Sequence, residues 1–236
     1  MKYAKITGLL FILGALGVFI PYTILTITFD YPDVLRQDAG EVLTKFHHGG
    51  NSLILTWWLF AMLGLPLLIA YVQLGNRLTS FTNSSNWLTY IGVIGLIVQM
   101  VGLLRWTFVV PVLANNFVLG NEANKEFSKA LFQVVHQYGG VVLGEHLGQL
   151  FTIIWVVGTV RIMQKSKIVP QWHNWLGYVS SVVYLLAQAE LFATVIPGFP
   201  VWDPAGFIGS TLWLIWITAL GVILLTQKAV HTVWNK

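Results

Sequence analysis

The residues best suited to chemistry are four ionisable side chains that interrupt long apolar stretches, namely Arg105, Glu145, His146 and Glu190. A guanidinium can hold a carboxylate or another anion, and carboxylates and imidazoles can exchange protons. Charge inside an apolar helix is costly, so such residues usually pair or face water and are functional candidates by default. Arg105 is the only lysine or arginine in this set. We therefore expect Glu145, Glu190 or both to neutralise it.

One helical face on the fourth apolar stretch extends this set. Tyr138, Glu145 and Gln149 recur at spacings of about one and two helical turns, so a regular α-helix places them on the same side. A carboxylate on a membrane helix is expected to turn away from lipid, toward water or a cation. We predict a ligand-binding site built from Arg105, Glu145, His146, Glu190, Tyr138 and Gln149.

The depth of these residues along their helices supports a shared site. Counting at the rise of an α-helix from the predicted cytoplasmic ends places Arg105 about 27 Å up, Glu145 about 24 Å, and His146 and Glu190 about 22 Å. Three different apolar stretches thus carry ionisable groups at a similar level. We expect a polar site in the outer third of a membrane, open toward the outside.

The elements that must position these residues are six apolar segments. The chain is 56% hydrophobic and only 9% charged, far from the composition of a soluble domain. A hydrocarbon core needs about 20 apolar residues per helix. The segments that satisfy this requirement are 6–29, 51–74, 87–113, 131–160, 174–196 and 205–227. We predict an all-α, polytopic integral membrane helical bundle, a single domain over 1–236 with six transmembrane helices and a short external amphipathic helix within 30–50.

Charge placement predicts the topology. Seven carboxylates occupy alternate loops, which are Asp30, Asp33, Asp38, Glu41, Glu122, Glu126 and Asp203. Eight basic residues occupy the other set, which are Lys2, Lys5, Arg77, Arg161, Lys165, Lys167, Lys228 and Lys236. Basic loops stay in the cytoplasm, so we expect both termini there and the chain in the cytoplasmic membrane, with the lipid bilayer as its surroundings. The net charge of +4 is explained by this signal, and we expect no nucleic-acid partner.

Metal and cofactor chemistry is disfavoured by the spacing of the candidate ligands. His47, His48, His136 and His146 all fall on the predicted outer side, but they form no HxxxH or HExxH pair. The chain has no cysteine, which excludes thiolate ligands. We expect no metal and no cofactor.

A glycine row distinguishes the fourth segment. Gly140, Gly144 and Gly148 repeat at intervals of four residues, which lets another helix approach closely and offers a face for oligomerisation. The helical pattern runs from about Lys125 to Arg161, too long for one upright span. We expect a bend at Gly139 and Gly140.

Three runs of residues carry a family resemblance. They are Leu103-Leu104-Arg105-Trp106 through Pro111, Gly139-Gly140 through Gly144-Glu145-His146-Leu147-Gly148, and Gln188-Ala189-Glu190. The chain resembles a bacterial family of six-span membrane proteins known as a domain of unknown function. The resemblance covers most of the chain and implies a bacterial cytoplasmic-membrane protein, without a substrate, cofactor or catalytic residue.

Three functions stay open at the level of the sequence. An outward-facing site could bind or transport a small solute or a proton. The same groups could serve a membrane-embedded enzyme that acts on a lipid or small apolar substrate, with Glu145 or His146 as acid or base. The third alternative is a structural or accessory subunit, in which the buried charges only fix helix packing.

Overall fold

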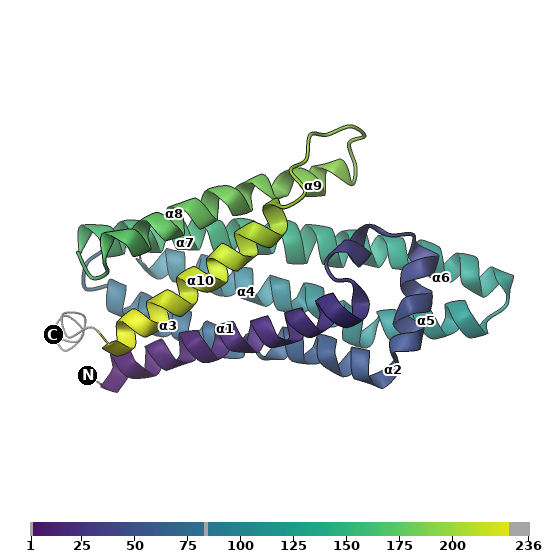
Figure 1. The fold of residues 1–236 in the computed structure, drawn as a ribbon, viewed down its shortest axis with the longest axis horizontal. Helices are drawn as coiled ribbons and strands as arrows, with labels where there is room; N and C mark the ends of the chain where they lie inside the picture. The colour runs from purple at the N-terminus through teal and green to yellow at the C-terminus, as the bar shows by residue number, and fades with distance from the viewer. Residues whose placement is uncertain (1, 83–84, 227–236) are drawn as a thin grey trace. The chain divides into compact units, whose positions relative to one another are not determined.

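The fold is helical throughout the part of the chain that the computed structural model describes, residues 2–82 and 85–226 (Figure 1). The predicted cytoplasmic residues Lys228 and Lys236 lie outside these ranges. In chain order the elements are α1 (Lys2–Phe29), η1 (Asp33–Arg36), α2 (Ala39–Met62), α3 (Leu65–Leu78), α4 (Ser85–Phe108), α5 (Val110–Leu119), α6 (Glu122–Val135), η2 (His136–Leu147), α7 (Gly148–Lys165), α8 (Gln171–Leu186), α9 (Gln188–Ala193) and α10 (Ala205–Thr226).

Within residues 2–82 and 85–226, six helical runs are long and apolar enough to cross a membrane. They are Tyr3–Phe29, Ala39–Leu78, Ser85–Leu119, Glu122–Lys165, Gln171–Ala193 and Ala205–Thr226. Large apolar side chains point outward along these runs: Ile27 is 76% exposed and Phe108 is 66% exposed. Such exposure suits lipid rather than water. The all-α class and the six spans predicted from the sequence are confirmed.

The second run is longer than predicted because it includes the segment before Gly50. Asp38 caps the start of α2 by accepting hydrogen bonds from the backbone N–H groups of Gly40 and Glu41. The helix is interrupted at Gly50, where φ is 55° and ψ is −153°, a conformation that favours glycine. The residues before this kink correspond to the predicted amphipathic helix, and Phe46 on it is buried. Val34 belongs instead to the separate turn η1.

The chain forms two compact units. The first unit comprises Met1–Leu16, Leu65–Ile97 and His146–Lys236, and the second comprises Gly17–Gly64 and Val98–Glu145. The chain passes from one unit to the other within α1, between α2 and α3, within α4 and within η2. The single domain over 1–236 stays a prediction.

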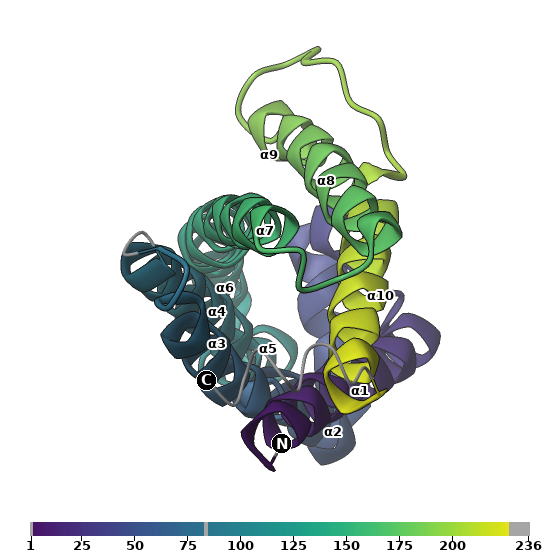
Figure 2. The same cartoon turned by 90° about the vertical axis from the view of Figure 1, so that its left-hand side faces the viewer.

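In the first unit α8 packs side by side with α10, and α7 packs against α8 (Figures 1 and 2). Gly209 makes the first of these contacts close, because a Cβ atom there would lie 2.8 Å from Cα of Tyr184. Aromatic rings fill the interior: Tyr71 stacks on Trp155, and Trp216 meets Trp155 edge-on with ring centroids 5.7 Å apart. His173 is fully buried here.

The second unit has an aromatic core of its own. Trp57 of α2 and Trp106 of α4 are fully buried and stack with ring centroids 4.8 Å apart and an interplanar angle of 11°. Phe29, Phe46 and Phe132 pack around Trp106. Helices α2, α5 and α6 contact one another (Figure 1), and each contributes buried residues to this core. Large rings with few rotatable bonds make this a rigid base for the neighbouring Arg105.

Candidate functional site

The helix that carries Glu145 has an unusual winding. Residues His136–Leu147 form a π-helical run of 12 residues, which includes Gly139 and Gly140, where we predicted a bend. A π-helix pairs each residue with the fifth along the chain, so α-helical spacing does not decide which side chains share a face here. Tyr138 is 63% exposed, whereas the side chain of Glu145 is 20% exposed. Such π-helical turns occur frequently at functional sites.

Arg105 is buried in the second unit, with 8% of its surface exposed. Its Nη1 donates a hydrogen bond to the backbone oxygen of Gly102, and its Nη2 lies 3.5 Å from Nδ1 of His136. The guanidinium fits against η2 because position 140 is glycine: a Cβ atom on Gly140 would lie 2.5 Å from Nη2. The Nε atom of Arg105 is buried without a hydrogen-bond acceptor among the described residues.

Glu145 forms its direct ion pair with Arg36 and not with the predicted partner Arg105. The Oε2 atom of Glu145 lies 2.7 Å from Nη2 of Arg36, and the two side chains are 20% and 28% exposed. The turn η1 brings Arg36 to η2, although this residue lies in the segment 30–50, which we predicted to be external. The negative charge of Glu145 still stabilises the positive charge of Arg105 through space. The second carboxylate oxygen, Oε1, is buried without a hydrogen-bond donor among the described residues.

We call Arg36, Arg105, His136 and Glu145 the guanidinium cluster. Within these four residues two guanidinium charges stand against one carboxylate charge, and a protonated His136 would add a further positive charge. Arg105 also lies over Trp106, with its Cζ atom 5.2 Å from the ring centroid. A group of this composition attracts an anion and offers it hydrogen-bond donors.

The other predicted site residues belong to the first unit. His146 Nδ1 lies 2.7 Å from Oε1 of Gln188, and Nε2 of Gln188 donates to Oε1 of Gln149 at 2.5 Å. Glu190 lies in the first turn of α9, and its carboxylate approaches Gly206. Arg105, Tyr138 and Glu145 lie in the second unit. A single site built from all six residues stays a prediction.

Three residues of these sites were missed from the sequence. Arg36 was assigned to a loop, His136 was considered only as a metal ligand, and Gln188 was noted only within the Gln188-Ala189-Glu190 run. The available signal for Arg36 was a lone arginine in an otherwise acidic segment. No sequence signal connects it to η2, because that contact depends on how η1 folds.

The glycine row packs within the chain at two of its positions. Gly140 faces Arg105, and a Cβ atom on Gly144 would lie 3.5 Å from Cα of Gly102. The predicted close approach of a neighbouring helix is therefore met by α4. Oligomerisation through Gly140, Gly144 and Gly148 stays a prediction.

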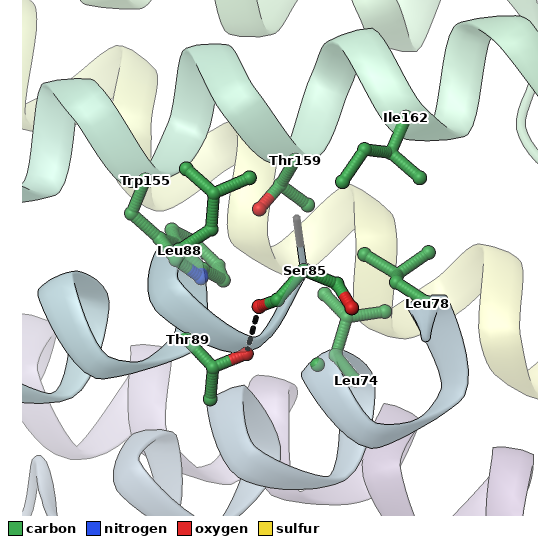
Figure 3. A pocket seen from close by; sticks show the side chains of 9 residues that line it. Leu74, Leu78, Ser85, Leu88, Thr89, Trp155, Thr159 and Ile162 are labelled. Atoms are coloured by element: carbon green, nitrogen blue, oxygen red, sulfur yellow. Dashed lines mark hydrogen bonds between the residues drawn. The ribbon is translucent and has the colours of Figure 1, made fainter. Parts of the chain in front are cut away.

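Two hollows outside the guanidinium cluster differ in their lining. A narrow crevice with no room for a water molecule lies in the first unit among α3, α4 and α7, lined by apolar side chains and by Ser85, Thr89 and Thr159 (Figure 3). It has no charged residue in its lining, and the hydroxyl of Thr89 already donates to Ser85 O at 2.7 Å. An open cleft of about 590 Å³ in the second unit is lined by residues that include Glu41, Lys45 and Lys129. Among the described residues no cluster of three or more candidate metal ligands occurs.

The six apolar helices define the class of the molecule, a multi-pass membrane protein. Residues 6–221 match the family model described as "Domain of unknown function (DUF4386)", and the chain belongs to this family. This confirms the resemblance found in the sequence. Comparison with curated proteins gives no match, and comparison with solved structures gives none either.

Proposed function

We propose that this membrane protein binds a small solute with an anionic group, such as a carboxylate, at the guanidinium cluster. The observation that carries the proposal is Arg105. Its guanidinium is buried, and its direct hydrogen-bonding partners among the described residues are neutral, a backbone carbonyl and an imidazole.

A buried charge without a direct counter-ion is expensive. Leaving one member of a buried pair uncompensated costs about 3–5 kcal/mol, and the penalty is relieved when an opposite charge arrives with good hydrogen-bond geometry. Arg105 has an unused donor at Nε. A carboxylate or phosphate group would accept from that donor and neutralise the excess charge.

The Arg36–Glu145 pair controls access to this charge. Both side chains are partly exposed, so the pair can exchange with water and with solutes more readily than Arg105. Glu145 competes with an incoming anion for both guanidinium groups. Removing the carboxylate charge therefore strengthens anion binding, whereas removing Arg105 weakens it.

The binding experiment uses the purified protein in lipid nanodiscs, titrated with acetate, benzoate and inorganic phosphate in turn. Ligand-induced stabilisation against heat reports binding, because a ligand that binds the folded state raises its stability. We expect stabilisation by at least one anion, a loss of at least about tenfold in affinity for Arg105→Gln, and a gain for Glu145→Gln. The control is Arg161→Gln, the same change at an exposed arginine.

Three results would overturn the proposal. They are no stabilisation by any of these anions, equal affinities for Arg105→Gln and Arg161→Gln, and weaker anion binding by Glu145→Gln. The last result would make Glu145 a ligand for a cation or a proton instead.

We propose further that the bound solute is transported. The support is the location of Arg105, His136 and Glu145 on helical runs long enough to cross a membrane. Uptake of the labelled anion into sealed proteoliposomes, lost in Arg105→Gln, is the expected result. Chemical conversion of the solute in detergent, where no sealed compartment exists, would favour the alternative of a membrane-embedded enzyme.

The topology is also a proposal: both termini in the cytoplasm of a cytoplasmic membrane. It is supported by the acid-free set of basic loops. The chain has no cysteine, so single cysteines report cleanly with an impermeant thiol reagent on intact cells. We expect labelling at Asp38→Cys and protection at Ser166→Cys. The reverse pattern contradicts the topology.

A further inference from the structure

A chain of three polar side chains crosses from α9 to the junction of η2 and α7 in the first unit. His146 Nδ1 meets Gln188 Oε1 at 2.7 Å, and Gln188 Nε2 meets Gln149 Oε1 at 2.5 Å. Gln188 is only 5% exposed. A buried amide in a membrane helix is costly unless both its donor and its acceptor are used, and Gln188 uses both.

With the Gln188 amide placed so that its Nε2 donates to Gln149, its Oε1 faces His146, and a hydrogen on Nδ1 of His146 completes the chain. In the neutral ring the other nitrogen, Nε2, then bears a lone pair. Among the residues that the structure describes, none forms a hydrogen bond to this Nε2 atom.

The fold holds Gln188 in place for this contact. The residue begins α9, directly after Ala187, where α8 and α9 are separated. Its amide reaches two residues that are three positions apart on the neighbouring helix, so both ends of the amide are fixed. The edge of the His146 ring meets Phe192 of α9 with centroids 6.0 Å apart, which restricts ring rotation.

Among the described residues, no ionisable side chain forms a hydrogen bond or a ring contact with the imidazole of His146. From α9 the groups that face His146 are Gln188 and Phe192. The ionisable residue of that helix is Glu190, whose carboxylate approaches Gly206 of α10. On its own helix the preceding residue, Glu145, is paired with Arg36.

We propose that Nε2 of His146 is a proton-binding site and that Gln188 is the residue that positions it. An imidazole with Nδ1–H fixed by a neutral acceptor presents one basic nitrogen in a defined direction, as a proton carrier requires. The proposal does not depend on anion binding, because it rests on different residues in the other unit.

The test is nitrogen-15 NMR of histidine-labelled protein in nanodiscs, with the His146 signals assigned by their absence in His146→Gln. In the wild-type protein we expect the Nδ1–H tautomer for neutral His146, with the added proton on Nε2 when the ring becomes charged. In Gln188→Leu we expect the Nε2–H tautomer to become dominant. The control is Gln164→Leu, which removes another interhelical glutamine hydrogen bond, the 3.1 Å contact from Tyr178 Oη, and should leave the His146 signals unchanged.

Each result bears on one part of the proposal. An Nε2–H tautomer in the wild-type protein overturns the assignment, and this measurement needs no variant that must fold. A wild-type His146 that takes up no proton on acidification while the protein stays folded overturns the proton site. An unchanged tautomer in Gln188→Leu removes Gln188 from its positioning role.

Discussion

Replacing Gly140 with alanine adds a single methyl group at the point where the Arg105 guanidinium packs against η2. A Cβ atom at this position would lie 2.5 Å from Nη2 and 2.7 Å from Cζ of Arg105. Ordinary contact requires about 3.5 Å, so the guanidinium must move by about 1 Å. That movement disturbs the hydrogen bond to Gly102 O and the 3.5 Å contact with His136.

The expected change in the free energy of unfolding follows from two destabilising effects and one stabilising effect. Overpacking costs about 1–3 kcal/mol, and weakening a hydrogen bond from a charged group costs about 1.5–3 kcal/mol when the bond is lost. Alanine returns about 1 kcal/mol through its better helix propensity. We expect Gly140→Ala to lower the free energy of unfolding by about 1.5–5 kcal/mol, with a loss of affinity for the anion.

Gly144→Ala is the matched control on the same π-helical run. Its added Cβ atom would lie 3.5 Å from Cα of Gly102 and 3.5 Å from Gly139 O, which is ordinary contact. We expect stability equal to the wild type or higher. Thermal unfolding in nanodiscs, with and without anion, measures both effects. Equal stability and equal anion affinity for Gly140→Ala and Gly144→Ala would refute the role assigned to the packing of Arg105 against Gly140.

Two further predictions concern stability. In a double-mutant cycle of Arg36→Gln and Glu145→Gln, we expect a coupling free energy of about 1 kcal/mol, because the 2.7 Å ion pair is only partly exposed. Denaturant or thermal unfolding measures this coupling. Simple additivity of the two single variants would show that the pair does not form. His173→Ala should lower the free energy of unfolding by about 2–4 kcal/mol, because the ring is fully buried, stacks on Trp216 and forms a 3.2 Å hydrogen bond with the backbone oxygen of Trp216. The control His48→Ala, at an exposed position, should change the free energy of unfolding by less than about 0.5 kcal/mol. Similar losses in both variants would contradict this prediction.

The spans could be predicted from the sequence because hydrocarbon thickness sets their length. The last predicted segment, 205–227, nearly coincides with α10, Ala205–Thr226. The second was predicted to begin at residue 51, and the helical run begins at Ala39, because Gly50 allows one helix to follow another after a sharp kink. Hydrophobic periodicity indicates a helix before Gly50 and a helix after it, but it does not indicate that the two form one continuous run.

The candidate site was harder to predict because its geometry is tertiary. The π-helical run from His136 to Leu147 changes the side on which each residue lies, so the face built from Tyr138, Glu145 and Gln149 does not follow from α-helical spacing. Arg36 reaches Glu145 through a short turn in a loop. By contrast, burial of Arg105 could be predicted, because a lone arginine within an apolar span has few other places to lie.

Anion binding at Arg105 is tested most directly by NMR of the arginine Nε–H groups. The chain has four arginines, Arg36, Arg77, Arg105 and Arg161, so each signal can be assigned by one Arg→Gln variant. On titration with the anion that stabilises the protein, the Arg105 signal should move as its unpaired Nε–H acquires an acceptor, and the Arg161 signal should stay in place. An Arg105 signal that does not move at a saturating anion concentration would contradict the account.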